Sequence, residues 1–237
     1  MEPLPDQVRE HVGGASGRER DDDPDRFVPN AVSASSMAVR SNPHGAPAWP
    51  RAALGPDIGL ACDAHGTYTV SEAKQFCRLV EDANLMWFEE PVTGDDKRGM
   101  AEVRAGSSVP IAAGESEFTR YDFRDLAELR AADIFQPDLA ICGGISEAMR
   151  IGAIASAWNL RPAPHLWTGA LAFAAGMHVA AASPSGWILE YSLGANPMLH
   201  DLSKESFTVI EGMLEIPDRP GLNVTIHQDF VDRSAVA

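Results

Sequence analysis

Positive charge is scarce in this sequence of 237 residues. The chain has 19 lysines and arginines against 34 aspartates and glutamates, which gives a formal net charge of −15 at pH 7. A surface this acidic repels the phosphates of nucleic acids and the headgroups of anionic lipids. We therefore expect neither a nucleic acid nor a membrane as a partner.

Long apolar runs and paired cysteines are also missing. The longest apolar stretch, around residues 169–182, is interrupted by His178 and is shorter than the ~20 residues that a membrane-spanning helix needs. The opening MEPLPDQVRE lacks the cationic start and apolar core of a secretory signal. Cys62, Cys77 and Cys142 have no C-x-x-C spacing, so neither a disulfide framework nor a zinc site is indicated. These features favour a cytoplasmic location.

The amino-acid composition changes near residue 50. Residues 1–50 hold 7 of the 17 prolines and an acidic run at residues 21–25, and they show no sustained apolar period. A segment with so little apolar surface to bury cannot offset the entropy cost of ordering the chain. We expect residues 1–49 to be disordered or irregular and residues 50–237 to form the folded domain.

Short apolar runs alternate with helical periodicity after residue 50, a pattern typical of β/α units on a parallel sheet. Thr69 with Glu72, and Thr119 with Asp122, are candidate pairs for capping the helices that follow them. An Ala-rich helix is expected near residues 170–182. The six predicted strands are residues 58–64, 85–91, 109–115, 134–140, 161–167 and 187–192.

Three carboxylates stand at the C-terminal ends of successive predicted strands. Asp63, Glu89 and Glu115 are separated by 26 residues in each case, and equal spacing places equivalent strand ends side by side in a parallel barrel. Carboxylates that meet in an apolar mouth raise one another's pKa values and need a shared cation. Ligation by oxygen alone selects Mg²⁺ first, then Mn²⁺ or Ca²⁺. Any one of the three taken alone is more simply a strand-end cap or a surface acid.

A carboxylate and an imidazole follow at the ends of the next two strands. Asp138 beside His165 would fix the imidazole tautomer and raise its pKa, as a general base requires. Glu190 on the last strand either is protonated and donates a hydrogen bond or meets a substrate hydroxyl. His65, two residues beyond Asp63, either reaches the substrate from the side opposite His165 or is a loop histidine on the rim.

Together these residues resemble a known family. The resemblance covers roughly residues 50–220 and implies an α/β fold with a partial TIM-type (β/α) barrel, like the enolase C-terminal domain. The D-x-H form at Asp63 and His65, together with Glu190, is similar to acid-sugar dehydratases of the D-galactonate dehydratase kind. The motifs DAHG at Asp63, FEEP at Glu89, AAGE at Glu115, QPDLAICGGISE at Asp138 and PHLW at His165 are similar to those of the enolase superfamily, in its mandelate racemase and muconate lactonizing branch.

The resemblance also implies a reaction. A proton α to a carboxylate is very weakly acidic, so its removal needs a cation that stabilises the developing enediolate. Loss of water from the β-carbon then yields a 2-keto-3-deoxy acid. We expect a lyase that acts on a small sugar acid and forms a homo-oligomer. The implied roles are ligands of one Mg²⁺, replaceable by Mn²⁺, for Asp63, Glu89 and Glu115, general base for His165 with Asp138, general acid for His65, and substrate contact for Glu190.

Two departures from the family pattern leave other functions open. The family's N-terminal capping domain and first two barrel strands, the second often carrying a K-x-K base, have no counterpart, and the lysines are Lys74, Lys97 and Lys204. Six strands cannot close an eight-stranded barrel, so we expect a truncated chain with open sheet edges. A racemase, epimerase or cycloisomerase of the same branch is one alternative, and an inactive barrel remnant is another.

Overall fold

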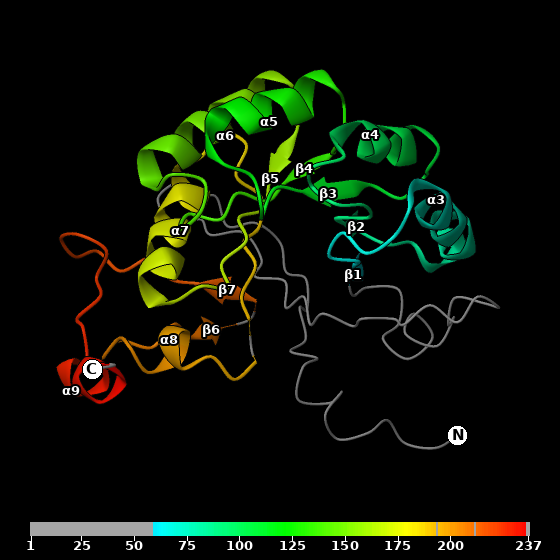
Figure 1. The fold of residues 1–237 in the computed structure, drawn as a ribbon. Helices are drawn as coiled ribbons and strands as arrows, with labels where there is room; N and C mark the ends of the chain where they lie inside the picture. The colour runs from blue at the N-terminus through cyan, green and yellow to red at the C-terminus, as the bar shows by residue number, and fades with distance from the viewer. Residues whose placement is uncertain (1–58, 193, 211, 236–237) are drawn as a thin grey trace, which may run out of the picture.

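The computed structural model describes residues 59–192, 194–210 and 212–235 of the chain (Figure 1). The expectation for residues 1–49 lies outside this part of the chain. The alternation of strands and helices that the sequence predicts is confirmed. The elements in chain order are β1 (Ala61–Asp63), α3 (Val70–Leu79), the 3-10 helix η1 (Glu81–Ala83), β2 (Trp87–Glu89), α4 (Lys97–Ala105), β3 (Ile111–Ala113), α5 (Thr119–Glu128), β4 (Ile134–Phe135), α6 (Ile145–Ala157), β5 (Arg161–Pro162), α7 (Ala170–Ala182), α8 (Pro197–His200), β6 (Val209–Ile210), β7 (Met213–Leu214) and α9 (Gln228–Ser234).

Five parallel strands form one sheet in chain order, from β1 to β5. Asp63 lies opposite Glu89, and Glu89 opposite Ala112, so neighbouring strands end at nearly the same level. The helices α3 to α7 arch around this sheet (Figure 1). This β/α arrangement is that of a partial barrel and confirms the predicted fold class. It brings the residues that follow each strand together at one end of the sheet.

The sixth predicted strand, residues 187–192, is not among the five strands of the sheet. It contacts the segment just after β5 through a backbone hydrogen bond from Glu190 N to Pro164 O at 3.0 Å. The Ala163 N–H donates to β4, so the backbone groups of Pro162 and Pro164 face the opposite edge of β5. Proline has no N–H, so these two residues cannot donate hydrogen bonds to a further strand.

The predicted side-chain cap is present at the start of α3 and differs from the prediction at the start of α5. Glu72 Oε2 accepts from Thr69 N at 2.9 Å, and Thr69 Oγ1 accepts from Glu72 N at 3.4 Å, so the predicted capping box at α3 is confirmed. The predicted cap at Thr119 is wrong, because Thr119 lies in the first turn of α5. Asp122 Oδ2 accepts instead from Phe118 N at 2.9 Å, just before that turn.

The main hydrophobic core lies between the sheet and its helices. Phe88 in β2, Phe123 in α5, Phe135 in β4 and Phe173 in α7 have no exposed surface. The rings of Phe123 and Phe135 meet edge to face, with centroids 5.2 Å apart. Burying a side chain of this size contributes roughly 1.5–3 kcal/mol. Side chains along a strand point alternately to the two faces of the sheet. Because this packing fixes which strand residues face the helices, the residues directly before and after them must point to the opposite face.

The C-terminal part adds a small hairpin and two short helices. The strands β6 and β7 pair antiparallel, with Val209 opposite Leu214. A bridge between Ser203 and Ile226 joins the segment after α8 to the segment before α9. Within the described part of the chain, no helix has the length and apolar character to cross a membrane. The three cysteines are free thiols.

Candidate active site

The inner face of the sheet carries an apolar layer followed by a polar one. Trp87, Ala112, Ile134, Ala163 and Ile188 form the apolar layer, and Ala61 packs against it. Side chains along a strand alternate between faces, so residues two positions later point the same way. The strands therefore bring a ring of polar groups together at their C-terminal ends. This polar ring consists of Asp63, Glu89, Gln136, His165 and Glu190, each two residues beyond the apolar layer, while Gly114 holds the corresponding position after β3.

Two of the three predicted metal ligands have carboxyl groups that resist ionisation. Burial raises the pKa of Asp63, and the charge of Glu115 raises it further. The pKa of Glu89 lies well above its usual range because the side chain is buried and because Glu190 adds negative charge. Glu89 Oε2 accepts a hydrogen bond from Trp87 Nε1 at 3.0 Å, which fixes its position. A cation shared by these acids would lower their pKa values.

His165 and Asp138 form the predicted pair. Asp138 Oδ2 lies 2.9 Å from His165 Nδ1, and Asp138 Oδ1 accepts from Ala140 N at 2.7 Å. Burial by itself lowers the pKa of His165. The hydrogen bond to Asp138 and the negative charges of Glu190 and Glu115 outweigh burial and raise this pKa to about 9. The pair thus holds the imidazole in one orientation and favours its protonation.

Glu115 lies between the two histidines. Its Oε1 is 3.1 Å from His65 Nδ1, and its Oε2 is 3.5 Å from His165 Nε2. The side chain of His65 is 74% exposed, whereas that of His165 is 14% exposed. The structure therefore brings His65 into the site at its solvent-facing rim, in contact with the same carboxylate as His165.

Glu90, the second acid of the FEEP motif, is a site residue that the sequence prediction misses. It is buried, and burial together with the charge of Glu115 raises its pKa to about 7. Ligand atoms of His65, Glu90 and Glu115 all lie within 4.8 Å of one another, a group that shares Glu115 with the predicted trio. Strand parity assigns Glu90 to the face opposite Glu89. The backbone φ of Glu90 is +35°, which changes the direction of the chain at this point. No sequence pattern indicates this backbone conformation.

Two buried oxygens of the ring have no hydrogen-bond partner in the described part of the chain: Gln136 Oε1 and Glu190 Oε2. The other oxygen of Glu190 accepts from Trp167 Nε1 at 2.7 Å. Burial raises the pKa of Glu190 to about 7, against the opposing effect of His165. A buried acceptor left unpaired costs about 1–3 kcal/mol, so a ligand or a proton is expected there. The sequence prediction also misses Gln136, although the two-residue alternation from Ile134 points to it.

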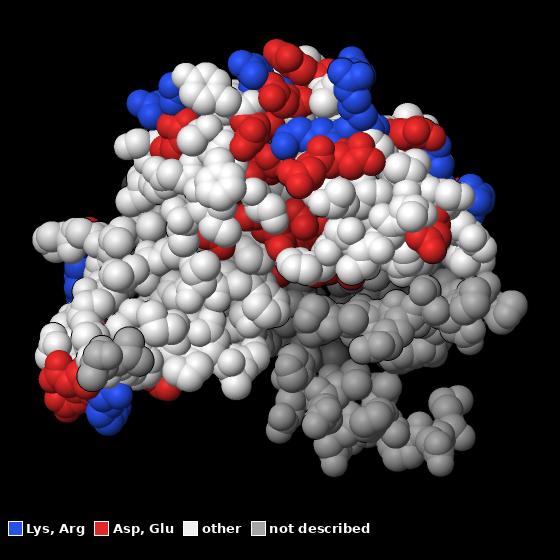
Figure 2. Space-filling model, viewed as in Figure 1, with Lys and Arg blue, Asp and Glu red and all other residues white. Residues whose placement is uncertain are grey.

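The donor chemistry of the predicted ligands suits a hard divalent cation, because Asp63, Glu89 and Glu115 offer carboxylate oxygens, the ligands that Mg²⁺ prefers. In the described part of the chain, however, the group whose ligand atoms lie within 4.8 Å of one another is His65, Glu90 and Glu115, which includes neither Asp63 nor Glu89. Lys97 forms an ion pair with Glu117 at 2.7 Å. Acidic side chains gather near the middle of the face shown in Figure 2, in keeping with a concentration of negative charge.

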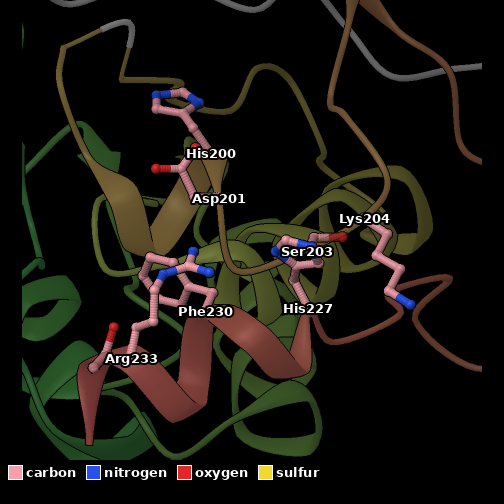
Figure 3. A pocket seen from close by; sticks show the side chains of 8 residues that line it. His200, Asp201, Ser203, Lys204, His227, Phe230 and Arg233 are labelled. Atoms are coloured by element: carbon pink, nitrogen blue, oxygen red, sulfur yellow. The ribbon is translucent and has the colours of Figure 1, made fainter.

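A hollow lies beside α8 and α9, two helices that Figure 1 shows apart from the five-stranded sheet. Lys204 points away from His200 and Arg233 (Figure 3), and all three side chains are exposed. Functional sites favour buried ionisable groups that converge, so we place the active site at the strand ends and not in this hollow. The hollow has a volume of about 600 Å³ and is lined by His200, Asp201, Ser203, Lys204, His227, Phe230, Arg233 and Ser234.

Known proteins match most of the chain. The arabinonate dehydratase of Saccharolobus solfataricus is 39% identical over 176 residues, which cover 74% of this chain and 47% of that protein. The D-galactonate dehydratase of Xanthomonas oryzae pv. oryzae is 33% identical over 190 residues, which cover 78% of this chain and 50% of that protein. The chain thus spans about half the length of the curated relatives that it matches.

A solved structure and a protein family also match this chain. The crystal structure of the 3,6-anhydro-D-galactonate cycloisomerase from Zobellia galactanivorans has a TM-score of 0.73 to this chain at 32% identity, covering 77% of this chain and 52% of that one. Residues 48–230 match the family described as enolase C-terminal domain-like. This range contains all five strands of the sheet and every residue of the polar ring. The chain therefore belongs to the enolase superfamily, as an enolase C-terminal domain-like protein.

Proposed function

We propose that the protein removes the proton α to the carboxylate of a sugar acid and then eliminates water from the β-carbon, as a Mg²⁺-dependent acid-sugar dehydratase. The His165–Asp138 pair, with 2.9 Å between Nδ1 and Oδ2, carries this proposal. An imidazole held at Nδ1 by a carboxylate offers Nε2 as the proton acceptor in its neutral form. Proton removal adds negative charge to a site that is already acidic, so the reaction needs a cation.

Asp63, Glu89 and Glu115 would hold that cation. When bound, Mg²⁺ supplies positive charge to the substrate carboxylate and offsets the charge that develops as the α-proton leaves. Hydrogen bonds from neighbouring groups of the chain orient these ligands. His65 N donates to Asp63 Oδ1 at 2.7 Å, and Trp87 Nε1 donates to Glu89 Oε2 at 3.0 Å. Such outer contacts fix ligand direction and charge in metal sites.

His65 would protonate the leaving hydroxyl. His165 takes the α-proton, the C–O bond at the β-carbon breaks, and the hydroxide leaves as water with the proton from His65. The enol that remains takes up a proton to give the 2-keto-3-deoxy acid. Because His65 is exposed, it can exchange protons with solvent between turnovers.

The relatives support the substrate class. Two of the dehydratases that match this chain are named for aldonic acids, arabinonate and D-galactonate. We therefore take an aldonic acid as the substrate class. A cycloisomerase is the second candidate, favoured by the similarity to the Zobellia galactanivorans enzyme. A cycloisomerase rearranges its substrate without loss of atoms, so the mass of the product separates the two reactions.

The test is to incubate the purified chain with MgCl₂ and a panel of aldonic acids, including D-galactonate and D-arabinonate, in deuterated solvent. Proton NMR follows α-proton exchange, and mass spectrometry follows loss of water. We expect His165→Asn to abolish both processes. His65→Asn should retain some exchange but lose elimination, because the hydroxide then lacks a proton donor.

Each other outcome points to a different function. Water loss at the wild-type rate in His65→Asn would contradict the roles assigned here and favour an epimerase. A product of unchanged mass would indicate a cycloisomerase. If the wild-type chain exchanged no α-proton on any acid of the panel, an inactive barrel remnant would be the better description.

A further inference from the structure

Trp167 contacts two groups of the polar ring at once. Its indole lies nearly parallel to the imidazole of His165, with ring centroids 6.2 Å apart and 10° between the planes. Its Nε1 donates a hydrogen bond to Glu190 Oε1 at 2.7 Å. One side chain therefore holds both the plane of the candidate base and one oxygen of the neighbouring carboxylate.

The backbone of Trp167 is itself anchored. Its carbonyl oxygen accepts from Asn196 Nδ2 at 2.7 Å, and Asn196 Oδ1 accepts from Leu199 N at 3.3 Å in the first turn of α8. Trp167 is partly exposed and is not among the buried residues of the core. Its contacts with the ring therefore do more than fill apolar space.

The contact with Trp167 leaves the two oxygens of Glu190 unequal. Oε1 is occupied by the indole N–H, whereas Oε2 is buried without a partner in the described part of the chain. Because the two oxygens of a carboxylate are equivalent, the bond to Trp167 fixes the plane of the group and the place of its unpartnered oxygen. The indole thus determines where the carboxylate can meet a ligand.

We propose that Trp167 is a positioning residue, which holds the His165 imidazole and the Glu190 carboxylate in one fixed relation and leaves Glu190 Oε2 to bind a hydroxyl of an aldonic acid. The choice of ligand rests on the proposed function, whereas the positioning role rests on the two contacts of the indole, with His165 and with Glu190. Phenylalanine keeps a flat face but has no donor, and leucine has neither. Trp167→Phe therefore removes one contact, and Trp167→Leu removes both.

The kinetic test measures α-proton exchange on the best aldonic acid of the panel. We expect Trp167→Phe to raise KM about tenfold or more, as for loss of a hydrogen bond to a charged group, with kcat changed less than about threefold. Glu190→Gln should raise KM similarly, and the double variant should be no worse than Glu190→Gln, since both changes disrupt one interaction. Trp158→Phe, at the exposed end of α6, is the matched control and should match the wild type.

An NMR test needs no activity. The ring signals of His165 are identified by their absence in His165→Asn, and an aromatic face beside an imidazole displaces them through its ring current. Trp167→Leu should shift these signals well beyond any change in Trp167→Phe, and Trp158→Phe should leave them in place. Thermal unfolding of each variant verifies that it is folded.

Two results would overturn the inference. One is a set of His165 signals that do not move in folded Trp167→Leu. The other is a KM in Trp167→Phe equal to that of the wild type. If the wild-type chain exchanges no α-proton on any acid, the proposed function fails, and the His165 signals alone decide the positioning role.

Discussion

Asp138 holds His165 from a completely buried position. Its Oδ2 accepts from His165 Nδ1 at 2.9 Å, while its Oδ1 accepts from Ala140 N at 2.7 Å, so the carboxylate cannot turn away without losing a backbone contact. Asp138 follows β4 and His165 follows β5, and these strands are paired in the sheet. The packing of two adjacent strands therefore sets the distance within the pair.

Replacing Asp138 with Asn should slow α-proton exchange by about 100-fold or more, because a neutral amide cannot stabilise the imidazolium. The pKa of His165 should fall from about 9, since the hydrogen bond to Asp138 helps to raise it against burial. An NMR titration of the His165 ring measures the pKa. Asp125→Asn, on the exposed surface of α5, is the control and should change neither quantity. An unchanged pKa of His165 in Asp138→Asn would contradict the pairing.

Glu89→Gln should weaken Mg²⁺ binding by about tenfold or more in a calorimetric titration, because an amide oxygen replaces a charged ligand. Glu90→Gln is the sharper comparison, since Glu90 belongs to the neighbouring group with His65 and Glu115. We expect Glu90→Gln to retain Mg²⁺ affinity within about threefold, as should Glu128→Gln on the surface of α5. Loss of binding in Glu90→Gln with none in Glu89→Gln would move the cation toward His65.

Much of the strand scaffold could be predicted from the sequence. The apolar runs place β1 to β5, and the two-residue alternation within them decides which residues face inward. Glu89 stands two positions after Trp87, and His165 two positions after Ala163, so their direction follows from strand geometry alone. The predicted sixth strand, residues 187–192, is not part of the sheet for a local reason, the missing N–H groups of Pro162 and Pro164.

The residues just after the strands could not be placed by the same rule. Left-handed backbone at His65, Glu90 and Gly114, with φ of +47°, +35° and +138°, changes the direction of the chain where each strand ends. The contacts of Trp167 could not be predicted from the sequence for another reason. Its partner Glu190 is 23 residues away, and nothing in the PHLW motif indicates which side of His165 the indole takes.

Gly114→Ala should destabilise the chain by roughly 2–4 kcal/mol and displace Glu115. A Cβ there would lie 2.7 Å from Phe123 Cε1, and φ of +138° disfavours any side chain. Gly144 also has positive φ but open space around its Cβ position, so Gly144→Ala should cost about 1–2 kcal/mol. Each kcal/mol lowers the Tm by about 2–4 °C for a chain of this size. Equal losses of Tm in the two variants would show that the contact with Phe123 is unimportant.

The carboxylate of Glu205 ties the segment after α8 to the segment before α9. Glu205 Oε2 accepts from Thr225 N at 2.7 Å and from Ser203 Oγ at 3.0 Å, and Glu205 Oε1 accepts from Thr225 Oγ1 at 2.7 Å. The backbone and side-chain hydrogen bonds of Thr225 lower the pKa of Glu205 from 4.5 to about 2. The ionised form is therefore the one that holds the two segments together.

The pH dependence of stability follows from that lowered pKa. Because the pKa is lower in the folded chain, the contribution of Glu205 is complete above pH 4.5 and is lost as the pH falls toward about 2. Glu205→Gln should therefore have a lower Tm than the wild type at pH 7, and the difference should narrow between pH 4.5 and pH 2. Circular dichroism melts at a series of pH values measure it, with the exposed Glu215→Gln as the control. A difference in Tm that stayed constant down to pH 2 would show that Glu205 acts through packing and not through its charge.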